Sequence, residues 1–172
     1  MDANILAALR DELRRSLHGP AWHGPALLEV LCDVSPREAQ ERPLTGAHSI
    51  AELAFHALAW MEEVTRRLGG VEPALPARGD WPSADTALPT VESVRLLRVA
   101  GEALDESLAT FPAARLTALV GGAERDAAAG TGVTYADMLH GLAQHNAYHG
   151  GQIAILKKAV RDANADAFAT PA

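Results

Sequence analysis

Apolar residues recur every three or four positions along most of the chain, which is the period of an amphipathic helix. The first such run covers residues 3–17, and two Gly-Pro steps in residues 18–25 interrupt it. A second run from Ala26 to Val34 predicts that the first helix of the fold is broken by a kink. Residues 36–43 are polar and could add one or two helical turns.

Three longer helices are predicted after this broken one. Ser49 and Glu52 have the spacing of a capping box, in which each residue satisfies a free backbone N–H of the other. This helix should continue to about Leu68, because Gly69-Gly70 supplies a stop. The same three-four spacing predicts two further helices, which cover residues 91–110 and 135–160.

Residues 69–89 interrupt the helical pattern with four prolines and three glycines. The segment is too long for a tight turn, but it can cross a bundle and let the flanking helices run parallel. Trp81 is expected to pin it to the body of the protein. We therefore predict an all-α fold, a four-helix bundle with a broken first helix and a long crossover between the second and third bundle helices. Residues 1–172 would form one domain, with a flexible tail over residues 161–172.

Composition narrows the function classes. The chain has 172 residues, of which 48% are hydrophobic and only 5% aromatic, which suits a helical core. Its net charge of −7, without a long basic run, argues against binding nucleic acid. No apolar stretch is long enough to span a membrane. Cys32 is the single cysteine, so a reducing compartment fits, and we expect a cytoplasmic protein.

Three histidines lie close together in HGLAQHNAYHGGQI, residues 140–153. A helix turns by about 100° per residue, so His145 and His149 share a face, whereas His140 points elsewhere. The shared face also carries Gln152 and the apolar stripe of the helix. Two imidazoles in an apolar stripe need partners, and one partner that satisfies both is a metal ion.

A third ligand is expected from a facing helix, and His56 is the best candidate because it lies beside Trp60 on an apolar face. Glu52 and Glu63 lie within one or two turns of it. Either glutamate could be a fourth ligand or the acceptor that orients a histidine ring. His23 could equally cap a helix or line a pocket. The competing interpretation is that the histidines only pack in the core.

The chain resembles the DinB-like family, also called the DinB/YfiT superfamily of metalloenzymes. The resemblance rests on WHGPALLEVL, HSIAELAFHALAW, DWP and HGLAQHNAYHGGQIAILKKA, and with the helix order it covers nearly the whole chain. It implies that His56, His145 and His149 hold a divalent metal in a four-helix bundle. It also implies that the protein forms a homodimer. Imidazole ligands suit Zn, Ni or Fe, and the spacing does not choose among them.

The family resemblance implies two enzymatic chemistries. Some relatives are transferases or isomerases that use a low-molecular-weight thiol, which an open metal site holds as thiolate. Others are described as hydrolases that use metal-bound water. A small-molecule substrate is expected in both cases. A hypothesis from another class is a metal-binding dimer without catalytic activity, whose metal site Glu52, Glu63 or another side chain would close.

Overall fold

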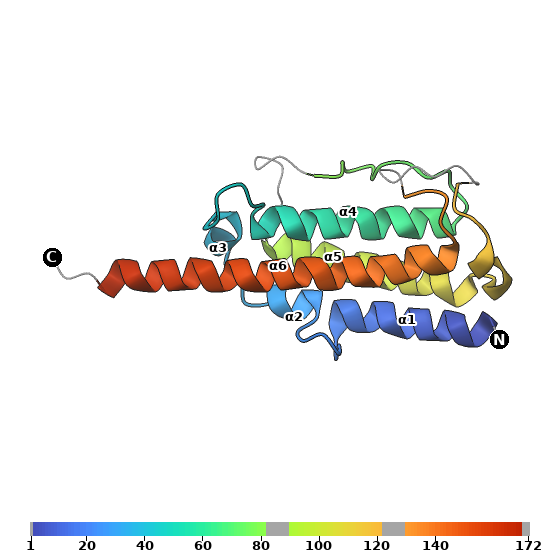
Figure 1. The fold of residues 1–172 in the computed structure, drawn as a ribbon, viewed down its shortest axis with the longest axis horizontal. Helices are drawn as coiled ribbons and strands as arrows, with labels where there is room; N and C mark the ends of the chain where they lie inside the picture. The colour runs from blue at the N-terminus through green and yellow to red at the C-terminus, as the bar shows by residue number, and fades with distance from the viewer. Residues whose placement is uncertain (1, 82–89, 122–129, 170–172) are drawn as a thin grey trace.

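A computed structural model describes residues 2–81, 90–121 and 130–169 of the chain (Figure 1). In chain order its helices are α1 (Asp2–His18), α2 (Leu27–Leu31), α3 (Pro36–Gln40), α4 (Ile50–Leu68), α5 (Thr90–Thr110), the 3-10 helix η1 (Ala113–Thr117) and α6 (Tyr135–Ala169). The described ranges contain two isolated β-bridges but no β-strand. The predicted all-α fold is therefore confirmed.

The long helices pack side by side with mixed directions (Figure 1). Helices α4 and α5 run in the same direction, and α1 and α6 run in the opposite one. Helix α2 follows α1 beyond the break, so α1 and α2 together occupy one position of the bundle. The apolar faces of all these helices meet in one continuous core.

The predicted capping box begins α4. The Glu52 backbone N–H donates to Ser49 Oγ at 3.3 Å, and Glu52 Oε2 accepts from the Ser49 backbone N–H at 2.7 Å. The helix ends at Leu68, and Gly70 follows with a φ of 83°, in the left-handed region that favours glycine. Both ends of α4 thus lie where the sequence predicts them.

The described part of the crossover, residues 69–81, runs back along α4 (Figure 1). Arg78 donates two hydrogen bonds to the Glu62 carboxylate, at 2.6 and 3.0 Å. Further back along the helix, the Trp60 indole N–H donates to Asp80 Oδ1 at 2.7 Å. The later crossover residue, Asp80, thus contacts the earlier helix residue, Trp60. The crossover therefore runs antiparallel to α4 and returns toward its start. The predicted crossover residues 82–89 lie outside the described part of the chain.

Trp81 fastens the crossover to the bundle, as expected. Its ring lies between two imidazoles, with centroid separations of 3.7 Å to His48 and 3.8 Å to His56. Each imidazole plane lies within 3° of the Trp81 plane. This stack covers the place where the histidines of α4 and α6 meet.

The predicted end of the last helix, near Val160, is wrong: α6 continues through residues 161–169. Residues 161–169, which belong to the segment expected to be a flexible tail, are helical because they are rich in alanine and contain neither glycine nor proline. Arg161 also joins it to the body, since it donates to Glu38 Oε1 at 2.7 Å and to Asp33 Oδ2 at 3.0 Å.

No helix in the three described ranges is both long and apolar enough to cross a lipid bilayer.

Candidate metal centre

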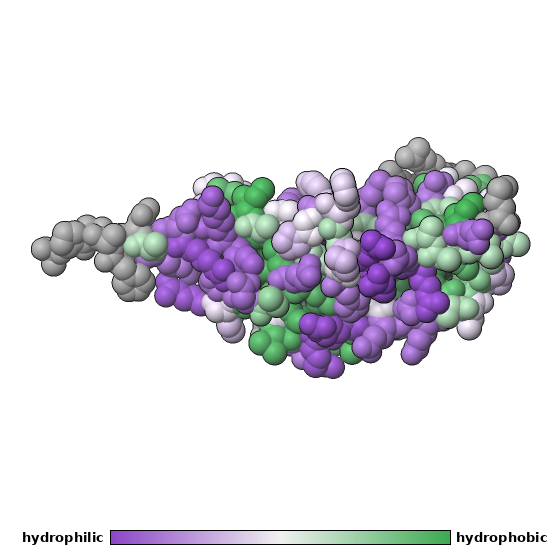
Figure 2. All heavy atoms as spheres, turned by 90° about the horizontal axis from the view of Figure 1, so that it is seen from below, coloured by the Kyte–Doolittle hydropathy of each residue, from purple (hydrophilic) through white to green (hydrophobic). Residues whose placement is uncertain are grey.

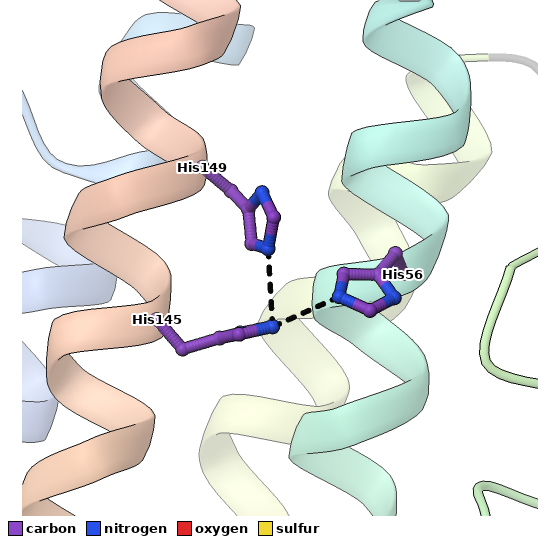
Figure 3. A group of neighbouring side chains, drawn as sticks. All are labelled: His56, His145 and His149. Atoms are coloured by element: carbon purple, nitrogen blue, oxygen red, sulfur yellow. Dashed lines mark hydrogen bonds between the residues drawn. The ribbon is translucent and has the colours of Figure 1, made fainter. Parts of the chain in front are cut away.

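Three histidine side chains meet between α4 and α6 (Figure 3). His145 and His149 lie one turn apart on α6, and His56 faces them from α4. His145 Nε2 lies 3.0 Å from His56 Nε2 and 3.1 Å from His149 Nε2. Within the described ranges, no other group of three or more histidine, cysteine or acidic side chains is close enough to hold an ion. We call these three residues the histidine triad.

The hydrogen-bond partners of the Nδ1 atoms show which ring nitrogens of His56 and His149 carry protons. His56 Nδ1 lies 2.6 Å from the Asp80 backbone oxygen, which can only accept, so Nδ1 carries the proton. His149 Nδ1 lies 2.6 Å from Gln152 Oε1 and donates to it. The Nε2 atoms of both rings therefore present lone pairs to His145 (Figure 3). One N–H of His145 can satisfy only one of the two, whereas a metal ion can accept all three lone pairs.

Burial keeps these rings neutral. Burial, and after it the positive charge that His149 and His56 could carry, lowers the pKa of His145 to about 3. Burial also lowers the pKa values of His56 and His149. Neutral imidazole is the form that ligates a metal, so no proton has to leave the triad at neutral pH.

The spacing of the triad suits a metal of zinc's size. Zn–N bonds of about 2.0–2.1 Å at tetrahedral angles place ligand nitrogens about 3.3 Å apart. The two measured Nε2–Nε2 separations, 3.0 and 3.1 Å, are only slightly shorter. The third separation, between the ligand nitrogens of His56 and His149, is limited only by the 4.8 Å within which all three ligand atoms lie. His56, His145 and His149 are therefore close enough together to hold a divalent ion.

His145 is held differently from its two partners. Its Nδ1 is buried and has no hydrogen-bond partner among the described residues. On its Nδ1 side the ring is held by packing, including an edge-on contact with the Trp60 ring at a centroid separation of 6.5 Å. Trp60, which the sequence placed beside the site, is therefore part of the wall that supports His145.

Asp80 is the residue of the site that sequence reasoning missed. Its backbone oxygen orients His56, and its carboxylate lies 3.4 Å from the same His56 nitrogen and accepts from Trp60. It lies in the crossover, where no periodicity indicates which side chains face the core. The DWP motif, residues 80–82, was the only signal that could have pointed to it.

Glu52, proposed as a ligand or ring acceptor, lies outside the triad. Its buried carboxylate accepts from Arg42 at 2.6 Å and from the Ser49 backbone at 2.7 Å. Burial opposes ionisation of Glu52, but the hydrogen bonds from Ser49 and Arg42 hold its pKa below the ordinary value. This carboxylate therefore caps the start of α4 and does not join the three nitrogens.

Glu63, the other glutamate candidate, belongs to a second buried polar cluster near the end of α4. Its Oε1 accepts from Arg67 Nε at 2.7 Å and from the Ala74 backbone N–H at 3.2 Å. Arg66 donates to both oxygens, at 2.8 and 2.9 Å. Burial opposes the charge, yet the two arginines hold the pKa of Glu63 below its ordinary value. The structure gives the role of ring acceptor to Asp80 and Gln152.

Two other histidines lie away from the triad. His23 is exposed and lines a groove between α1 and α6. His140 is exposed, with Nδ1 3.0 Å from Glu12 Oε2 and Nε2 3.0 Å from Gln144. The sequence excluded His140 from the site by helical phase, and the structure places it away from the triad. The sequence left the role of His23 open, and the structure places it in the wall of this groove.

Comparison with known proteins identifies the family of the chain. The model of the DinB superfamily matches residues 21–153. The chain belongs to the DinB superfamily. This match covers more than half of the chain and includes all three histidines, and it ends within α6. No match was found among curated proteins or among solved structures.

Within this DinB-superfamily chain the match begins in the break that follows α1 and covers α2 to α5 and the first half of α6. Helix α1 and the last part of α6 lie outside it. The triad, the acceptors that orient it and the crossover therefore all belong to the shared part of the fold.

Proposed function

We propose that this DinB-superfamily protein is a metal-dependent enzyme that activates a thiol for transfer to an electrophilic small molecule. The observation that carries the proposal is the donor set of the triad. Three Nε2 atoms converge, and Glu52 and Glu63, the nearby buried carboxylates on α4, are engaged elsewhere. A set of three neutral ligands leaves the full charge of a divalent ion available to an anion.

A divalent ion held by His56, His145 and His149 would lower the pKa of a thiol, or of a water molecule, in an open coordination position. The chain's own residues support the triad. The Asp80 backbone oxygen and Gln152 Oε1 fix the tautomers of two rings, and Trp81 stacks on His56. Trp81 is 39% exposed, so the stack forms part of the protein surface beside the triad.

The first experiment is elemental analysis of untagged protein purified without added metal or chelator. We expect about one Zn, Ni or Fe per chain, and none in His149→Ala, because two nitrogens do not make a stable site. His140→Ala is the matched control: it removes an exposed histidine of the same helix and should keep the metal. Stoichiometric metal in His149→Ala would contradict the assignment.

The second experiment distinguishes the reactions. Metal-loaded protein is assayed with a low-molecular-weight thiol and 1-chloro-2,4-dinitrobenzene, and separately with an activated ester and no thiol. We expect thiol transfer that disappears with chelation and in His149→Ala. Ester hydrolysis without thiol transfer would favour the hydrolase, and metal binding without either activity would favour a non-catalytic module.

The homodimer and the cytoplasmic location stay predictions. Tyr148 and Ile155, 65% and 64% exposed on α6, offer apolar area for a second copy. Light scattering after size-exclusion chromatography tests the dimer, and a Tyr148→Glu, Ile155→Glu variant should shift any dimer to monomer.

A further inference from the structure

A pocket of about 300 Å³ lies beside the triad, between α4, α6 and the segment that precedes α6. His145 and Trp60 belong both to its wall and to the surroundings of the triad. Two other cavities, one of about 360 Å³ between α1 and α5 and one of about 460 Å³ between α1 and α6, contain no triad residue. A ligand in the pocket beside His145 would therefore lie next to the metal centre.

The side chains of the pocket wall are mainly apolar, and they include Val64, Val133, Met138 and Leu142. Two charged residues also line it, and both have structural contacts. Arg67 donates to Glu63, to the Ala74 backbone and to the Gly130 backbone at 2.7, 2.9 and 3.2 Å. Asp137 accepts from Thr134 at the start of α6.

Gly141 contributes no side chain to the wall of the pocket. Gly141 lies within α6 and lines the wall of the pocket, and a Cβ at this position would meet no atom within 4 Å. A glycine inside a helix costs about 0.5–1 kcal/mol relative to alanine. The side chain that is missing here would project into open space, so its absence leaves room beside His145.

We propose that this pocket, which we call the Gly141 pocket, binds the uncharged apolar part of the substrate next to the triad. Its volume lies at the lower end of the range for small-molecule sites, about 300–1,000 Å³. Because its charged wall residues already have partners, binding would come from burial of apolar surface, at about 0.8 kcal/mol per CH₂. The proposal rests on the proposed function, since it assigns the substrate of the same site.

The pocket itself is tested without any thiol. Titration with 4-fluorotoluene, followed by ¹⁹F NMR, measures binding to wild type, Gly141→Ala, Gly141→Leu and the matched control Gly151→Leu. Gly151 lies on the same helix, is exposed and also has open space around a Cβ. We expect saturable binding to wild type and Gly151→Leu, weaker binding to Gly141→Ala, and at least tenfold weaker binding to Gly141→Leu. Metal content should be equal in all four.

Two results would overturn the pocket assignment. One is the absence of saturable binding to wild type, and the other is equal affinity for Gly141→Leu and Gly151→Leu. Gly141→Ala protects the test against a folding defect in the leucine variant, because alanine favours a helix and meets no neighbour.

The link to the metal is tested with thiols on Co(II)-loaded protein, whose thiolate charge-transfer absorbance reports ligation. Affinity should rise about fourfold per CH₂ from ethanethiol to hexanethiol in wild type, and this gain should disappear in Gly141→Leu. Thiol ligation without a chain-length effect would reject the pocket and keep the proposed function. Binding of 4-fluorotoluene that depends on Gly141, without thiol ligation, would reject the proposed function and keep the pocket.

Discussion

Helix α4 carries two buried polar clusters, the histidine triad at His56 and the Glu63–Arg67 cluster about two turns later, and they differ in how their atoms are satisfied. In the second cluster, donors and acceptors match: the Glu63 carboxylate meets arginine and backbone N–H groups. In the triad, the Nε2 atoms of His56 and His149 both present lone pairs to His145, and one N–H of His145 could satisfy only one of them. Burial alone therefore does not indicate a ligand site; the balance of donors and acceptors does.

Removing a histidine of the triad should produce the largest difference between the two clusters. We expect His145→Ala to weaken metal binding by more than about 100-fold, because loss of a ligand exceeds the effect of losing an orienting partner. Stability of the metal-free protein should change little, since the apolar faces of the helices supply most of it. Metal titration and urea unfolding of the same preparations measure both. Unchanged metal affinity would remove the distinction between the clusters.

Glu63→Ala should act in the opposite way. It leaves Arg67, which is 1% exposed, without its carboxylate, and breaking a buried pair typically costs about 3–5 kcal/mol. Glu63→Ala should keep the metal stoichiometry of the wild type when it is measured under conditions in which the variant is folded. Glu62→Ala is the control, because Glu62 forms a partly exposed pair with Arg78 and should cost less than about 1 kcal/mol. If Glu63→Ala lost no more free energy of unfolding than Glu62→Ala, the Glu63 cluster would be dispensable for stability.

A smaller effect is expected from the acceptor of the triad. Gln152→Ala removes the oxygen that fixes the His149 tautomer, so metal affinity should fall about 10- to 100-fold while stoichiometry is kept. Gln144→Ala, which removes an exposed amide of the same helix that contacts His140, should leave affinity unchanged. Isothermal titration with both variants separates the orienting role from a general effect on α6.

Surface ion pairs should give the smallest effect, and a pH-dependent one. Lys157 and Arg161 lower the pKa of Asp33 to about 2, and Arg161 and Ser35 lower that of Glu38 to about 2. A lowered pKa stabilises the fold above the ordinary pKa, near 4, and this contribution is lost as pH falls toward 2. Arg161→Ala should therefore be slightly less stable than wild type at pH 7 and equal to it below pH 2. Lys158→Ala, also exposed, is the control in acid-unfolding curves. A difference that persists below pH 2 would contradict the carboxylate explanation.

The sequence predicted the helices and the triad because both follow the helical period. His145 and His149 could be placed on one face from their spacing. His56 was the best candidate for the facing ligand because it lies on an apolar face, and the family resemblance implied the same three residues. The glutamates of α4 were candidates because they lie within one or two turns of His56, but their actual partners, such as Arg42, lie partly in irregular segments. The side chain of Asp80 could not be placed from the sequence, because the crossover has no hydrophobic period that predicts which of its side chains face the core. The same holds for the stacking of His48 on Trp81.

Asp80 and the last helix show two different limits. Asp80 is positioned by tertiary contacts across 24 residues, which no local rule contains. The extension of α6 beyond Val160 agrees with local propensity, whereas the predicted end rested on the general tendency of chain termini to be disordered. Arg161 and its two acidic partners, far away in sequence, show why that end stays on the body.

The triad also joins parts of the chain that are distant in sequence, since His56 and His145 are 89 residues apart. An ion bound there would act as a reversible cross-link that closes a long loop, in a chain whose single cysteine cannot form an internal disulfide. Ligand that binds only the folded state raises the free energy of unfolding with its concentration. The melting temperature of this protein should therefore record the supply of metal in its surroundings.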